Sequence, residues 1–179
     1  MTEQQKRFIE LHYFEKKKYP EIERIMGLSR ETIHKLVDDK VKEVIEDIQK
    51  IRSKFTEKRK IGFNNDFKAF YEWYISQEQK CGYCGISQDE LYEIFKEKHI
   101  LPYLESDREY QKNPKRSSGT LEIERLDSSV SYNPSNLILA CPLCNNAKSN
   151  LIDEKSWRDL FVPAMRKYYE KLLNKKLKN

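Results

Sequence analysis

The chain has 179 residues and a mass of 21.6 kDa, enough for one medium domain or two small ones and too little for a large multidomain enzyme. Charged residues make up 35% of it, and only 5 Gly and 6 Pro are present, which excludes collagen-like and loop-dominated chains. No stretch approaches the roughly 20 apolar residues of a membrane span, and the N-terminus lacks a secretory signal. We therefore expect a cytoplasmic protein with no membrane partner. The net charge of +5 permits binding to nucleic acid without arguing for it.

Three short helices are expected at the start of the chain. Thr2 and Gln5 have the spacing of a capping box and precede a helical apolar stripe. Pro20 suits the first turn of a second helix, which should end at Gly27. Ser29 is placed to cap a third helix.

The second and third helices, over residues 19–38 (YPEIERIMGLSRETIHKLVD), resemble a helix-turn-helix. Gly27 permits the turn, although Glu23 stands where such motifs usually have a small residue. The resemblance implies a recognition helix that presents side chains to double-stranded DNA. The outward-facing residues would be Arg30, Glu31, His34 and Lys35. A generic three-helix packing unit is the alternative interpretation.

A heptad pattern of apolar residues follows, with alternating steps of four and three. Its members are Val37, Val41, Val44, Ile48, Ile51 and Phe55. This seam is either a connector helix that packs on its own chain or a coiled coil that makes a homodimer. We favour the homodimer, because the later members need cover. The stretch 59–65 (RKIGFNN) is the expected boundary between a first domain, 1–58, and a second, 59–179.

The second domain is expected to begin with two helices. Asn64 or Asn65 should cap the first of them, and Ser87 with Glu90 forms a capping box for the next. The polar residues 101–119 predict a long loop.

A β-hairpin is expected near the end of the chain. Residues 121–126 and 137–140 have strand character and are separated by a polar turn. A short helix and a C-terminal helix broken near Pro163 complete the pattern. The predicted fold class is therefore mostly α with one small β-hairpin.

All the cysteines fall in two Cys-x-x-Cys pairs, Cys81–Cys84 and Cys141–Cys144. Two such turns present four thiolates to one tetrahedral ion, the donor set of structural zinc sites. With four thiolates the ion has no open position, so the predicted zinc is structural. It would stabilise a hairpin that is too small to fold alone.

Residues 121–150 (LEIERLDSSVSYNPSNLILACPLCNNAKSN) resemble the HNH endonuclease superfamily, in its arginine-bearing branch. The resemblance is carried by Asn136 with the next leucine, and by the second cysteine pair followed by Asn145 and Lys148. It implies a ββα-metal nuclease domain stapled by zinc over 59–179. Where the family usually has a histidine as general base, this chain has Arg125, which stays protonated and cannot act as a base.

The residues at this site can be assigned chemical roles. Glu124 and Asn145 offer oxygen ligands that suit a catalytic Mg²⁺ or Mn²⁺, and no organic cofactor is expected. Arg125 suits the charge that develops on a phosphoryl oxygen.

Four more residues complete the predicted site. Tyr132 or Asp127 would be the base, with Tyr132 preferred. By the resemblance Asn136 orients the hairpin loop, and Lys148 can meet a phosphate.

The sequence thus favours a metal-dependent DNA endonuclease with a helix-turn-helix arm. A non-catalytic DNA-binding regulator with a zinc-stapled domain is the alternative. A structural or interaction protein that uses the heptad seam is the third possibility.

Overall fold

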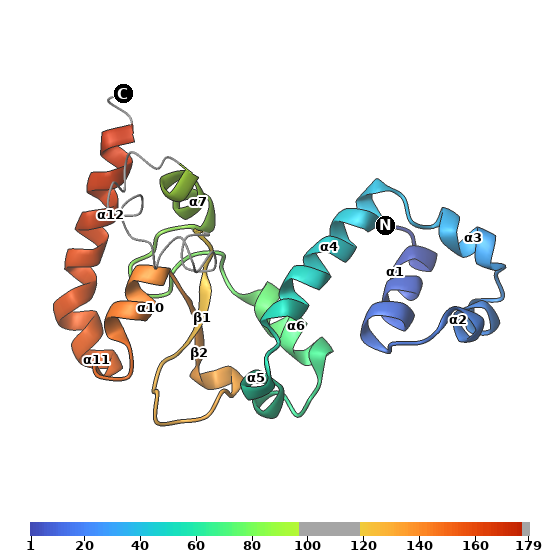
Figure 1. The fold of residues 1–179 in the computed structure, drawn as a ribbon, viewed down its shortest axis with the longest axis horizontal. Coiled ribbons are helices and arrows are strands. Elements are labelled where there is room, and N and C mark those ends of the chain that lie inside the picture. The colour runs from blue at the N-terminus through green and yellow to red at the C-terminus, as the bar shows by residue number, and fades with distance from the viewer. Residues whose placement is uncertain (97–118, 177–179) are drawn as a thin grey trace, which may run out of the picture. The chain divides into compact units, whose positions relative to one another are not determined.

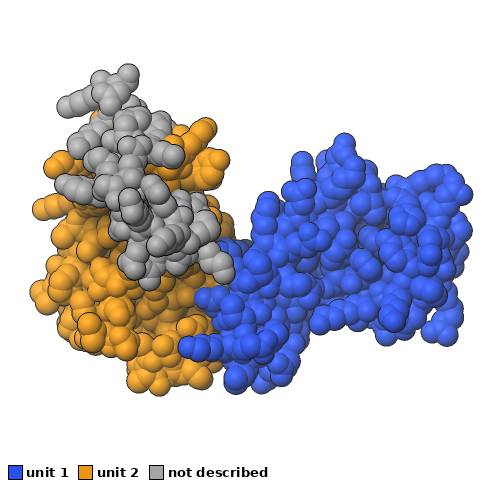
Figure 2. Space-filling view, in the orientation of Figure 1, with its two compact units in different colours: residues 1–76 blue, residues 77–179 orange. Residues whose placement is uncertain are grey.

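The computed structural model describes residues 1–96 and 119–176, and it divides into two compact units, residues 1–76 and 77–179 (Figures 1 and 2). Both units are mainly helical, and the second contains a two-stranded antiparallel sheet. The loop expected over 101–119 lies outside the described residues, apart from Gly119. Among the helices that the structure describes, none is both long and apolar enough to cross a membrane.

The first unit is built from helices alone over its whole length. In chain order its elements are α1 (Glu3–Ile9), the π-helical turn η1 (Glu10–Phe14), α2 (Tyr19–Met26), α3 (Arg30–Lys35), α4 (Asp39–Lys54), α5 (Glu57–Gly62) and α6 (Phe67–Ser76). The predicted start signals are confirmed. Thr2 and Gln5 form the reciprocal capping box, with backbone-to-side-chain bonds of 2.8 and 3.2 Å. The Ser29 hydroxyl accepts the Thr32 N–H, and Gly27 ends α2 with a left-handed φ of 65°.

The cap of α6 differs from the prediction. Asn64 and Asn65 adopt left-handed φ values of 52° and 60°, a region that asparagine tolerates better than most residues, so they form the turn that follows α5. The carboxylate of Asp66 caps α6 instead, since it accepts the backbone N–H groups of Lys68 and Ala69 at 2.8 and 3.1 Å.

The heptad seam runs along α4 and is largely covered within the single chain. Its buried members are Val41, Ile48 and Ile51. The ring of Phe55, which follows α4, lies 5.6 Å from the ring of Phe67 and 4.9 Å from that of Phe70, both on α6. Most of the apolar side chains of the seam are therefore covered by residues of the same chain. The connector interpretation requires this cover, whereas we expected a partner chain to supply it in a coiled-coil homodimer.

This packing also explains where the chain divides. Helix α6 joins the first unit because its aromatic residues pack beside the end of α4. The division after Ser76 consequently falls further along the chain than the expected boundary between 58 and 59.

The second unit holds the hairpin between helical segments (Figure 1). In chain order its described elements are α7 (Gln88–Lys96), β1 (Glu122–Arg125), the 3-10 turn η3 (Pro134–Asn136), β2 (Leu137–Ala140), α10 (Pro142–Lys148), α11 (Glu154–Ser156), the π-helical turn η4 (Trp157–Phe161) and α12 (Val162–Lys176). The capping box of Ser87 and Glu90 is confirmed at the start of α7. The break expected near Pro163 takes the form of the π-helical turn, which ends just before this proline.

The hairpin is confirmed, and its register decides which residues share a face. Glu122 pairs with Ala140 and Glu124 with Ile138 in the antiparallel ladder. Because side chains alternate along a strand, the two glutamates project from the same face of β1, opposite to the buried Ile123.

Candidate active site and metal centre

Each cysteine pair forms its own tight turn. In the first turn, Cys81 N–H donates to the Ile86 carbonyl at 2.8 Å, and Gly85 N–H donates back to the Cys81 carbonyl at 2.9 Å. In the second turn, Cys141 is the N-cap of α10, and its sulfur accepts the Cys144 N–H at 3.3 Å. These hydrogen bonds orient the two thiols of each pair.

The four thiols converge on one point in the interior of the second unit. All four cysteines are buried and free of disulfides, and their sulfur atoms lie within 4.8 Å of one another. The Cys84 and Cys141 sulfurs are 3.8 Å apart. A tetrahedral ion with Zn–S bonds of ~2.3 Å requires S···S edges of about 3.8 Å, so the residues fit zinc. The predicted cluster of four metal-binding cysteines is thus present.

Hydrogen bonds within the cluster favour the thiolate, the form that binds metal, at two of the four cysteines, and the pKa values of the other two, Cys141 and Cys144, are raised. Hydrogen bonds from the Cys141 and Cys144 thiols lower the pKa of Cys81, and those from the same two thiols lower the pKa of Cys84. The buried Tyr169 of α12 lies against the cluster, where burial and the nearby charge of Cys141 raise the pKa of its hydroxyl.

Beside this cluster, α10 packs against β1 and two side-chain contacts cross between them. Asn145 and Lys148 are three residues apart on α10 and so share one side of the helix. The Asn145 side-chain amide donates to the Glu122 carboxylate. The Lys148 ammonium lies 3.3 Å from Glu124 Oε1 and 3.3 Å from the backbone oxygen of Arg125.

The pair of Glu124 and Lys148 is removed from water. The Lys148 side chain is 0% exposed and that of Glu124 is 13% exposed. Burial raises the pKa of Glu124, an effect that the Lys148 charge and hydrogen bond oppose. The expectation that Lys148 meets a phosphate is therefore not matched by its placement, because the ammonium is enclosed and bonded inside the unit.

The predicted cation ligands, Glu124 and Asn145, come from elements that pack together. In this structure, however, each of them contacts a third residue: Glu124 contacts Lys148, and Asn145 contacts Glu122. Glu122 is not among the residues that the sequence predicted for this site. Strand alternation was the signal that could have found it, because it places Glu122 and Glu124 on one face.

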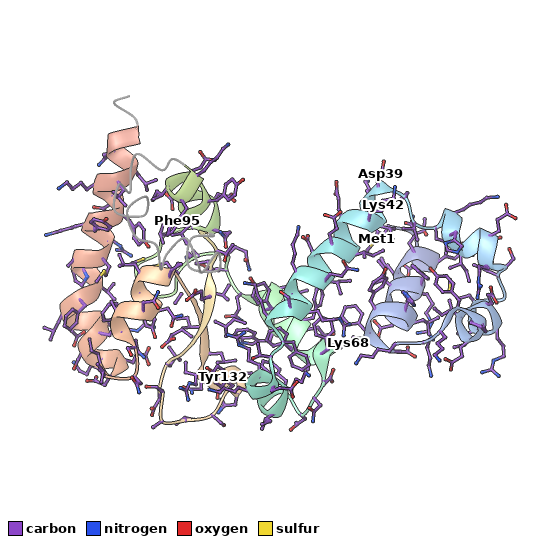
Figure 3. The ribbon with its side chains drawn as sticks, viewed as in Figure 1. Met1, Asp39, Lys42, Lys68, Phe95 and Tyr132 are labelled. Carbon is purple, nitrogen blue, oxygen red and sulfur yellow. The ribbon has the colours of Figure 1, made fainter. Side chains whose placement is uncertain are left out.

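Arg125 and Tyr132 are brought together at the end of β1. The guanidinium donates to the Val130 carbonyl at 3.1 Å, and its carbon lies 4.8 Å from the centre of the Tyr132 ring. Figure 3 shows Tyr132 in the segment that joins the two strands. Arg125 is the last residue of β1, so its side chain reaches this loop.

Asn136 fastens the same loop through several hydrogen bonds. Its side-chain oxygen accepts the Asp127 N–H at 2.9 Å, and its amide donates to the Asp127 carbonyl at 2.9 Å and to the Ser131 carbonyl at 3.1 Å. The Asp127 carboxylate accepts both the hydroxyl and the N–H of Ser129, which lowers the pKa of Asp127. These contacts are of the kind that a loop-orienting asparagine makes.

The residues predicted to bind DNA lie in the first unit, on α3. All four of them are exposed: Arg30, Glu31, His34 and Lys35. Arg30 pairs with Glu23 of α2 at 3.2 Å, and Lys35 pairs with Glu31 at 2.7 Å. The His34 ring stacks on Tyr19, with 5.2 Å between the ring centres. The two short helices thus support an exposed surface with two basic residues and one histidine.

The sequence and the structure were compared with known proteins. No protein family matches the sequence, and no curated protein matches it either. A solved structure of the rare-cutting HNH restriction endonuclease PacI is similar, with 29% sequence identity and a TM-score of 0.43. The alignment covers 59% of this chain and 64% of that chain, so the match spans less than two thirds of the length of PacI. A TM-score at this level does not establish a common fold or a common activity.

Proposed function

We propose that this chain is a metal-dependent endonuclease that hydrolyses phosphodiester bonds in double-stranded DNA. The observation that carries the proposal is the packing of β1 against α10, in which Glu122 contacts the Asn145 amide and Glu124 contacts Lys148. The same helix begins at two of the four converging cysteines. A hairpin followed by a helix, with zinc ligands at the start of that helix, corresponds to the ββα-metal core that residues 121–150 resemble.

The oxygen atoms on this face suit a hard divalent cation. Glu124 supplies a charged oxygen and Asn145 a neutral one, the donor types that Mg²⁺ and Mn²⁺ prefer. When bound there, such an ion would polarise the scissile phosphate and stabilise the leaving oxygen. A zinc ion bound by the four cysteines would hold the start of α10, and with it Asn145, against the hairpin.

Arg125 and Tyr132 would act on the phosphate and the water. Arg125 uses one of its several N–H groups on the Val130 carbonyl, so further donors remain for a phosphoryl oxygen. The hydrogen bonds from Ser129 stabilise the Asp127 carboxylate and make it a weaker base. This favours Tyr132, acting as its phenolate, as the group that takes a proton from the attacking water and becomes the neutral phenol.

The exposed face of α3 is the proposed DNA-binding arm. Its two basic residues, Arg30 and Lys35, form ion pairs that are exposed to solvent and so are weak. Phosphates of DNA can compete for both side chains. The helix-turn-helix resemblance assigns His34 and Glu31 to the same face.

One observation favours a second function, that of a non-catalytic DNA-binding regulator. Lys148 already neutralises Glu124, the carboxylate that a catalytic cation would require. If this ion pair persists in the presence of Mg²⁺, the chain would bind DNA without cutting it.

Plasmid cleavage separates these two functions. The zinc-loaded chain, freed of other divalent ions by dialysis, should nick supercoiled DNA when Mg²⁺ is added. Glu124→Gln and Asn145→Ala should remove the activity while the zinc content stays at one ion per chain. Asp89→Asn, an exposed acidic residue on α7, is the matched control and should cut normally. A wild-type chain that binds DNA but never nicks it would leave the regulator as the function.

The arm is tested by a gel shift. Arg30→Ala with Lys35→Ala should weaken binding to duplex DNA and flatten its salt dependence, because fewer phosphates are neutralised. Equal affinity and equal salt slopes in the variant and the wild type would exclude α3 as a DNA-binding helix.

A further inference from the structure

The two glutamates that share the face of β1 have different partners on α10. Glu124 contacts an ammonium, that of Lys148, whereas Glu122 contacts the side-chain amide of Asn145. The charge of Glu124 is thus balanced by a buried cation, and the Glu122 carboxylate is committed to one neutral side chain. The two carboxylates therefore have different roles at the site.

The Glu122 contact determines which end of the Asn145 amide can reach a metal. An ionised carboxylate only accepts hydrogen bonds, so only the amide nitrogen of Asn145 can face it. A rotated amide would bring its oxygen against the carboxylate oxygens, which repel it. With the nitrogen tied to Glu122, the oxygen Oδ1 is the end left for another partner.

We propose that Glu122 is a positioning residue that orients the Asn145 amide for the catalytic cation. The inference rests on the proposed function, since it concerns the same cation. A ligand that binds metal through one atom is commonly fixed by a hydrogen bond at its other end. Without Glu122 the amide rotates, and for much of the time it presents its N–H₂ group, which binds no cation. Glu122 itself contributes no ligand atom.

This role differs measurably from two simpler ones. If Glu122 were a direct ligand, its negative charge would be essential, and a glutamine would not replace it. If Glu122 only stabilised the fold, its removal would lower the melting temperature and leave metal affinity unchanged. A positioning role needs only an acceptor at this place, and the side-chain oxygen of a glutamine can supply one.

Binding of Mn²⁺, followed by electron paramagnetic resonance on the full zinc-loaded chain, distinguishes these roles. Glu122→Ala should weaken Mn²⁺ binding by about 10- to 100-fold, the usual cost of losing such a partner. Glu122→Gln should stay close to the wild type, and Asp89→Asn should equal it. Unchanged affinity in Glu122→Ala, or equal losses in Glu122→Gln and Glu122→Ala, would overturn the inference.

A double-mutant cycle tests whether Glu122 acts through Asn145. In an Asn145→Ala background, Glu122→Ala should cause no further loss of Mn²⁺ affinity, because there is no amide left to orient. Additive losses would contradict the inference. If Mn²⁺ binding requires Glu124 and Asn145 but not Glu122, only the positioning role fails. If the wild-type chain binds no Mn²⁺, the proposed function fails, and the inference fails with it.

Discussion

The two units of this chain are stabilised in different ways. The first unit contains no cysteine and is held by buried apolar side chains between helices, such as Leu11, Ile33 and Phe70, each 0% exposed. The second unit also has apolar residues at its centre, but its hairpin has only two strands of four residues. Its four cysteines lie where that hairpin meets α10. We infer that burial of apolar surface suffices for the first unit and that the candidate active site needs an ion.

The difference matters for function, because the site uses short elements that could not keep their geometry alone. A two-stranded hairpin is marginally stable in water. The Gly82 N–H of the first cysteine turn donates to the Leu139 carbonyl of β2 at 2.8 Å, and Cys141 caps α10. A zinc ion would therefore connect the parts that carry Glu124 and Asn145.

The largest expected effect is the unfolding of the second unit alone. Cys84→Ser, or a strong zinc chelator, should abolish its cooperative folding, because structural zinc contributes roughly 10 kcal/mol or more. The chain has two tryptophans, Trp73 in the first unit and Trp157 in the second. Fluorine NMR of a 5-fluorotryptophan-labelled chain should show Trp157 unfolded and Trp73 native. Loss of both signals together would contradict the separation of the units.

The reverse experiment weakens the first unit. Phe70 is fully buried and contacts the rings of Phe55 and Phe63, with centres 4.9 and 5.2 Å away. Phe70→Ala should cost about 4 kcal/mol, through lost burial and a cavity. The unfolding midpoint reported by Trp73 should move to a lower urea concentration, while the midpoint reported by Trp157 stays unchanged. Ile75→Ala, at a residue of the same helix that is 54% exposed, is the control and should change little.

A smaller effect is expected for the buried ion pair of the second unit. Lys148→Met leaves Glu124 largely buried without its partner, and breaking such a pair costs about 3 kcal/mol. The Trp157 transition in urea would report this loss. Lys155→Met removes a lysine that is 86% exposed and should be nearly neutral. An equal effect of the two substitutions would show that Lys148 is not enclosed in solution.

The smallest expected effect is a pH dependence of the first unit. The N–H of Val41 and the amide of Gln5 bond to the Asp38 carboxylate and lower its pKa below the ordinary 3.8. A lowered pKa stabilises the folded state above pH 3.8, and this contribution is lost as the pH falls through the folded pKa. Asp38→Asn keeps an acceptor but does not titrate, so Trp73 melting curves should depend less on pH below about 4. An unchanged acid dependence would exclude Asp38 as its source.

The features that the sequence predicted correctly are local ones. The capping boxes of Thr2 with Gln5 and of Ser87 with Glu90 depend on residues three apart, and Gly27 ends its helix by its own conformation. The convergence of the two cysteine pairs is a long-range feature, but it was predictable because each Cys-x-x-Cys spacing is that of half a four-thiolate zinc site. Each of these signals is a short pattern of residues close together in the sequence.

The features that it missed depend on tertiary packing. Nothing near α4 in the sequence shows that α6 covers part of its seam, or that Ile48 and Ile51, two of the residues behind the expected homodimer, are buried within the chain. The homodimer itself stays a prediction. The burial of Lys148 depends on β1, over 20 residues away in the chain. Strand alternation could have placed Glu122 beside Glu124, but the contact of Glu122 with Asn145 depends on the packing of the hairpin against α10.

The central claim is that the face between β1 and α10 holds a second cation beside the structural zinc. Anomalous diffraction from crystals of the zinc-loaded chain grown with Mn²⁺ and duplex DNA would test it most directly. We expect a zinc peak among the four cysteine sulfurs and a manganese peak between the Glu124 carboxylate and the Asn145 amide oxygen. A zinc peak alone, with Lys148 still paired to Glu124 beside the bound DNA, would contradict the claim.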